Sequence, residues 1–187
     1  GLKDAEIDAA IERSRKFFSY FVDKGTIPYG EHEPYPFHEN NGKSALAAVL
    51  FGLQDGQTDA TRFFAKMATA AYANREYGHT GQGFGYLWSA LGANVGGPGA
   101  GAAFFNEAQW HIDLVRRCDG TFTYDGGEQH GAGKTHDNTY YGRSSYAGLS
   151  PNATYVLTYS MPLKNLYITG KRSKKKNWLS QSEVSRA

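Results

Sequence analysis

Residues 43–54 read KSALAAVLFGLQ, a short run that is apolar on nearly every side. Such a run without a polar face predicts a short helix that is buried all round. A longer run follows at residues 59–77, where Phe63, Phe64 and Met67 recur at helical spacing among polar residues. This run predicts an amphipathic helix. Together the two runs predict a helix pair with one inner and one outer member.

The helix pair recurs about 41 residues further along the chain. Phe63-Phe64 of the first outer helix returns as Phe104-Phe105. Three positions of the first inner helix return at the same spacing: Gly42 as Gly83, Leu46 as Leu87 and Leu50 as Leu91. Two different helices that keep one spacing indicate a repeated unit.

Two further segments complete the helical pattern. The second pair consists of a short helix opened by residues 83–91 and a long helix at residues 98–118 that opens with Pro98. Residues 4–24 predict another long helix, capped by Asp4. Residues 152–159 predict a third short helix after Ser150-Pro151. Alternating amphipathic and apolar helices fit two concentric layers with the apolar helices inside. We therefore expect an all-α fold, an α/α-toroid-like arc of about three repeated helix pairs (six helices) with long Gly/Tyr-rich loops.

The composition narrows the class of protein. At 187 residues and 40% hydrophobic residues, the chain is long enough for one domain with its own core. No stretch approaches the roughly 20 apolar residues of a membrane span, so we expect a soluble protein without a membrane partner. No signal peptide is visible, and the compartment stays open because the native N-terminus is uncertain. A single cysteine, Cys118, excludes an internal disulfide framework, and it falls where a buried helical cysteine is expected. Trp88 and Trp110 also fall in predicted helices and are expected in the core.

The charge is divided unevenly along the chain. Residues 171–187 hold six basic residues and one acidic residue, a net charge of +5. Residues 1–170 hold 14 basic and 17 acidic residues, a net charge of −3. A Ser/Lys-rich end of this kind is typical of a disordered tail. We therefore expect a toroid-like domain at residues 1–170 and a basic flexible tail at 171–187, and we do not expect nucleic acid as a partner.

Four polar motifs carry a resemblance to a known family. They read HENNGKS at residues 38–44, HTGQGF at 79–84, DGTFTYDGG at 119–127 and THDNTYYG at 135–142. Over most of residues 30–170 the chain resembles a bacterial family of uncharacterised α/α-toroid domains, grouped by fold with the terpenoid cyclases and protein prenyltransferases. The resemblance implies the toroid fold. The family has no established activity to carry over, and fold alone does not supply one.

The polar residues gather in the loops that precede the inner helices. In a two-layer arc these loops lie at one end, and they contain five of the six histidines. We call the segments at residues 30–43, 78–83 and 120–149 the mouth, and we expect a functional site there. Polar loops and histidine caps also occur without function.

A polysaccharide is the ligand that best fits these side chains. Helix N-termini attract anions, so amides and Arg143 suit an acidic sugar while His136 or a tyrosine moves a proton. Two carboxylates would instead form a glycosidase pair. The candidate catalytic residues are His136, Tyr140, Tyr141, Asp137 and Glu39. The candidate substrate-binding residues are His38, Asn40, Asn41, His79, Asn138 and Arg143.

Other functions stay open. A metal-dependent hydrolase or transferase would draw its ligands from His130, His136, Asp137, Glu128 and Cys118. No closely spaced histidine pair supports that site, so no metal or other cofactor is assigned. The isoprenoid chemistry of the fold group is disfavoured because the chain has no adjacent aspartate pair. The mouth would also suit a non-catalytic module that binds a glycan, or a structural module whose toroid is completed by self-association or by a partner domain.

Overall fold

A computed structural model describes residues 3–28, 42–54, 56–70, 81–114, 116–122, 152–161 and 174–187. The helices are α1 (Ala5–Ser19), α2 (Lys43–Leu53), α3 (Thr58–Ala70), α4 (Gly81–Val95), α5 (Pro98–Leu114), α6 (Asn152–Ser160), the 3₁₀ turn η3 (Lys175–Asn177) and α7 (Gln181–Val184). In these ranges the chain is all-helical, apart from one isolated bridge between Arg116 and Phe122. The six predicted helices are confirmed.

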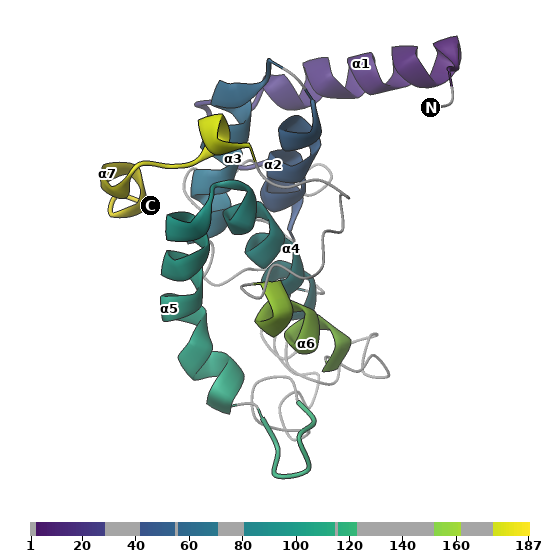
Figure 1. Cartoon of the computed structure of the whole chain (residues 1–187). Helices are drawn as coiled ribbons and strands as arrows, with labels where there is room; N and C mark the ends of the chain where they lie inside the picture. Colours follow the sequence, from purple (N-terminus) through teal and green to yellow (C-terminus); the bar gives the residue numbers. More distant parts are fainter. Residues whose placement is uncertain are drawn as a thin grey trace.

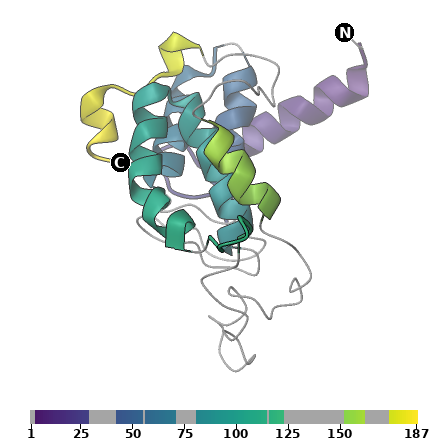
Figure 2. The same cartoon turned by 60° about the horizontal axis from the view of Figure 1, so that its bottom comes forward.

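Helix α1 begins at the predicted cap. The Asp4 side chain accepts hydrogen bonds from the backbone N–H groups of Glu6 and Ile7, at 2.9 and 3.1 Å. The helix ends at Ser19 instead of Lys24, and the next residues form a turn in which Asp23 has φ of 61°. No residue of α1 is buried, and Figures 1 and 2 show the helix projecting from the rest of the molecule.

The other long helices pack side by side. Helix α4 lies between α2 and α6, while α3 packs against α2 and α4, and α5 packs against α4 and α3 (Figure 1). The contacts at three glycines run in order along α2 and α4: Gly42 meets Trp88, Ala45 meets Gly92, and Gly52 meets Val95. Helices α2 and α4 therefore run in the same direction, as the two-layer arrangement predicts.

Two hydrophobic core clusters occur among the residues that the structure describes. One joins α2, α3 and the chain after α1, and in it the Phe51 and Phe64 rings stack at 5.7 Å. The other joins α4, α5 and α6 around Phe104, Ile112 and Tyr155. The phenylalanine pairs of the 41-residue repeat are buried differently, since the second of the pair is buried in α3 and the first in α5.

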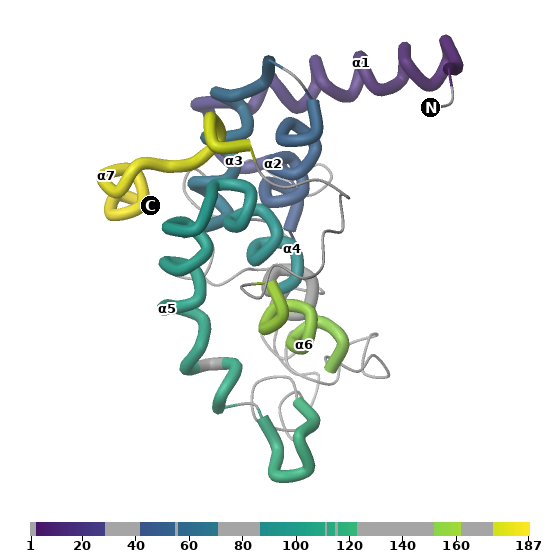
Figure 3. The backbone as a smooth tube through the Cα atoms, in the orientation of Figure 1, coloured from purple at the N-terminus to yellow at the C-terminus, as the bar shows by residue number. Residues whose placement is uncertain are grey.

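The C-terminal segment corrects the prediction of a disordered tail. Residues 174–187 contain η3 and α7, and these elements contact α3 and α5 (Figure 3). The physical reason is that Trp178 lies against Gly97 while Arg62 of α3 pairs with Glu183. Lys175 and Lys176 are exposed. The run of lysines predicted disorder, but the Trp178 contact that holds the segment could not be read from that run.

Candidate functional site

All eleven candidate catalytic and substrate-binding residues lie outside the described residues. They are His38, Glu39, Asn40, Asn41, His79, His136, Asp137, Asn138, Tyr140, Tyr141 and Arg143. Their assignments stay predictions. The described helices nevertheless show where the three loops that carry them begin and end.

The first loop ends at Gly42 against the middle of α4, the helix that follows the second loop. Gly42, which follows Asn41 directly, has φ of 75° and lies against Trp88 of α4. A Cβ atom added at Gly42 would come within 2.5 Å of the Trp88 ring, so only glycine fits this approach. Because α2 and α4 run in the same direction, the loops before these helices arrive at the same end of the molecule.

The two described residues that flank the third loop, Phe122 and Asn152, lie next to each other. The backbone N–H of Phe122 donates to the Asn152 side-chain oxygen at 2.6 Å, which ties the residue before the loop to the first residue of α6. The Phe122 ring lies 5.1 Å from the ring of the buried Tyr155. A polar and an aromatic contact therefore fix both ends of the segment that carries His136.

A tyrosine that lies near Phe122 forms a hydrogen bond with a carboxylate. The Tyr159 hydroxyl donates to Asp113, the penultimate residue of α5. Burial and this bond raise the pKa of Tyr159 to about 12. The hydroxyl is therefore neutral at physiological pH and is suited to positioning a polar ligand, not to accepting a proton.

The sequence analysis did not identify this pair, although one signal was present. A carboxylate in the last turn of a helix meets the negative end of the helix dipole. Asp113 is such a carboxylate, and a hydrogen-bond donor beside it offsets the unfavourable interaction with the helix dipole. Tyr159 supplies that donor from α6.

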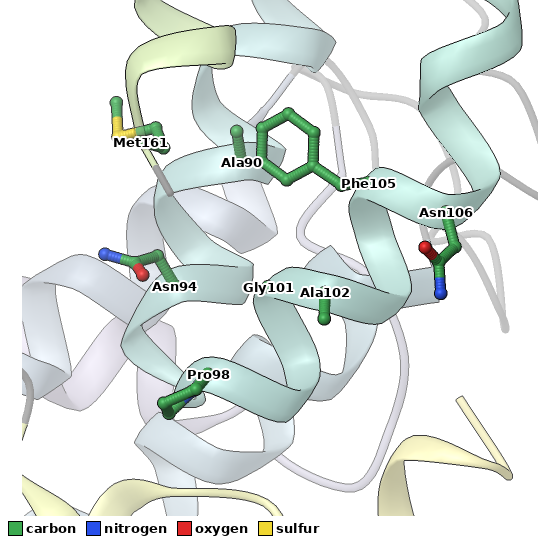
Figure 4. A pocket seen from close by; sticks show the side chains of 8 residues that line it. All are labelled: Ala90, Asn94, Pro98, Gly101, Ala102, Phe105, Asn106 and Met161. Atoms are coloured by element: carbon green, nitrogen blue, oxygen red, sulfur yellow. The ribbon is translucent and has the colours of Figure 1, made fainter. Parts of the chain in front are cut away.

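Two pockets lie among the described residues. One, of about 400 Å³, lies between α4 and α5 and is bordered by Met161, with the amides of Asn94 and Asn106 as its polar groups. Figure 4 shows the Phe105 ring reaching from α5 toward Ala90 of α4 in this pocket. The other, of about 480 Å³, lies between α1 and α2, and Lys43 is its charged residue. Neither contains a predicted site residue or a pair of groups suited to acid–base catalysis.

The metal alternative gains no support from the described part of the chain. No group of three potential His, Cys, Asp or Glu ligands occurs there. His130, His136, Asp137 and Glu128 lie outside it. Cys118 is exposed in a turn after α5, because that helix ends at Leu114. The expectation of a buried helical cysteine is therefore wrong. No described helix is long and apolar enough to cross a membrane.

The described residues define a class of protein, an all-helical domain whose helices pack against one another. The chain belongs to a family described as a domain of unknown function (DUF6288), whose model matches residues 1–170. Searches of the curated proteins and of the solved structures returned no match.

Proposed function

We propose that this domain binds or acts on a polysaccharide at the mouth formed by the loops before α2, α4 and α6. The observation that carries the proposal is the placement of the loop ends. Gly42 lies against Trp88, and Phe122 is bonded to Asn152, so the loop ends are held by packed helices. Rigid elements that hold polar loops are the usual setting of a binding or catalytic site.

The side chains of the mouth suit an acidic sugar. Asn40, Asn41, Asn138 and Arg143 would hold its carboxylate and hydroxyl groups near helix N-termini, where the potential is positive. His136 and Tyr140 or Tyr141 would then move the proton in an elimination. In a hydrolysis, Glu39 and Asp137 would serve as the carboxylate pair. His38 and His79 would add hydrogen bonds from the two shorter loops.

A non-catalytic interaction module is the second candidate, and the exposed apolar surface of α1 favours it. Ile7, Ile11 and Phe17 of this helix are 47%, 48% and 58% exposed. Large apolar side chains gathered on one projecting helix often mark an interaction surface. In that case the mouth holds a glycan without turnover while α1 joins the domain to a partner or to a further copy of the chain.

The deciding experiment measures turnover on a panel of neutral and uronate-containing polysaccharides. Both new reducing ends and unsaturated products are followed, with and without a chelator. Unsaturated products identify a lyase, reducing ends alone identify a hydrolase, and loss of activity with chelator supports the metal-dependent alternative. Binding without products supports the module. Absence of both across the panel contradicts the proposal.

A further inference from the structure

The C-terminal segment is fastened to the turn between α4 and α5. Gly97 in this turn has φ of 98°, and a Cβ atom added there would lie 2.5 Å from Cγ of Trp178. The next residue, Leu179, donates its backbone N–H to the carbonyl oxygen of Gly96 at 2.8 Å. The Trp178 indole and the Leu179 backbone therefore contact two consecutive residues of this turn, Gly97 and Gly96.

Arg62 of α3 binds the same segment. Its guanidinium group donates to the carbonyl oxygen of Trp178 and to the carboxylate of Glu183. Glu183 also accepts hydrogen bonds from the Ser180 hydroxyl and backbone N–H, at 2.7 and 2.8 Å, which completes a capping box at the start of α7. Residues 178–184 thus connect α3 to the α4–α5 turn.

The connection lies at one end of a pair of close-packed hairpins. Gly92 of α4 approaches Ala45 of α2 and Ala68 of α3 so closely that an added Cβ atom would lie 2.7–2.9 Å from their atoms. The two hairpins pack against one another on both sides of this contact, so a change in the angle between them would turn α4 about it. A link between α3 and the α4–α5 turn restrains that rotation.

We propose that residues 178–184 form a clasp that sets the angle between the α2–α3 and α4–α5 hairpins. The clasp lies outside residues 1–170 matched by the family model, so it is a feature of this chain beyond that match. Helices α2 and α4 begin at Lys43 and Gly81, at their ends away from the clasp. Holding the angle therefore also holds the distance between these two helix starts, whatever ligand the domain takes.

The test measures the distance between the hairpins in the full-length protein. Cys118→Ser provides a background without native thiols, and spin labels at Lys66→Cys on α3 and Leu114→Cys on α5 report the spacing by pulsed electron resonance. Trp178→Ala and Arg62→Met open the clasp in two independent ways. Lys176→Met is the matched control, because it removes one exposed positive charge from the same segment. Hydrogen exchange at the Leu179 amide reports release of the clasp in each variant.

We expect Arg62→Met to accelerate exchange at Leu179 about tenfold, as for loss of a charge-assisted hydrogen bond, and to broaden the label distances. Trp178→Ala should increase the exchange rate and the width of the distance distribution further. Lys176→Met should leave the exchange rate and the label distances unchanged. Faster exchange with unchanged label distances would overturn the proposal, because the segment would then rest on the body without setting the angle. Unchanged exchange in Arg62→Met would also overturn it. If Trp178→Ala loses its helical circular dichroism, the Arg62→Met result decides.

Discussion

Gly92 of α4 lies directly against Ala45 of α2, and a Cβ atom added to the glycine would be 2.9 Å from the Ala45 Cα atom. The neighbour is backbone and cannot move aside as a flexible side chain does. This contact therefore leaves no room for a side chain between α2 and α4 at this position.

Gly92→Ala is expected to destabilise the fold. The added methyl group overpacks the junction of α2, α3 and α4, which costs about 1–3 kcal/mol in the free energy of unfolding. The matched control is Gly101→Ala in α5, where an added Cβ atom meets only the Asn94 side chain at 3.9 Å. That substitution should stabilise by up to about 1 kcal/mol through helix propensity. Urea unfolding compares the two, and equal effects would contradict the close approach.

Gly97→Ala should cost more than Gly56→Ala. Both glycines have positive φ, 98° and 80°, so both alanine variants carry backbone strain of about 1–2 kcal/mol. Only Gly97 has a neighbour in the way, because nothing lies within 4 Å of a Cβ atom added at Gly56. The difference between the two unfolding free energies therefore isolates the Trp178 contact. A Gly97→Ala variant no less stable than Gly56→Ala would show that this contact is absent in solution.

Asn152→Ala should loosen the return of the third loop. The variant leaves the Phe122 N–H without its 2.6 Å acceptor, at a cost of about 1 kcal/mol. Asn152→Asp keeps an acceptor oxygen at the helix N-terminus and should remain as stable as the wild type. Thermal unfolding and limited proteolysis would distinguish them. If both variants behave alike, the bond does not anchor this segment.

The contribution of Glu183 should depend on pH in a defined direction. The Ser180 hydroxyl and N–H, together with Arg62, lower the pKa of Glu183 from 4.5 to about 2. The unfolded chain therefore takes up the proton first as the pH falls. The stabilisation is full above about pH 4.5 and is lost as the pH falls through about 2. The stability difference between wild type and Glu183→Gln should shrink across this window, and a constant difference would refute the assignment.

His136→Ala should abolish turnover on any polysaccharide that the panel identifies, with no change in the unfolding midpoint. The expected cause is loss of the side chain that transfers the proton, because general acid–base catalysis accelerates a reaction roughly 10²–10⁴-fold. His32→Ala serves as a control, since that histidine lies in the mouth but has no assigned role. Full activity in His136→Ala, or loss of its helical structure, would show that the site is misassigned.

The helices were predictable because their signals are local. Asp4 caps α1 and Pro98 opens α5 as the sequence indicates, and the apolar run at residues 43–54 becomes helix α2. The prediction that this helix is buried all round is wrong, because Leu46 and Leu53 are 37% and 41% exposed. The misses concern ends and exposure. Residues 20–24 form a turn instead of a helical end, and Trp110, expected in the core, is 51% exposed. Whether an aromatic residue on a helix is covered depends on its neighbours in space.

The sequence predicted which segments carry the candidate site, but it did not predict which side chains lie together. The sequence placed polar loops before the inner helices, and the direction of α2 and α4 agrees with that arrangement. The pairing of Tyr159 with Asp113 needed α5 and α6 to be placed first, because the two residues lie 46 positions apart.

What the sequence by itself determined is the all-helical class and the order of the helices along the chain, whereas the two-layer arrangement and the site at residues 30–43, 78–83 and 120–149 stay predictions. Hydrophobic periodicity and capping residues act within a few turns, so they can be read without a structure. The tertiary structure alone decided that the basic C-terminal segment is bound. Its attachment depends on Arg62 meeting Trp178 across 116 residues and on a glycine turn shaped to receive the indole. Such contacts arise only when distant segments are packed together.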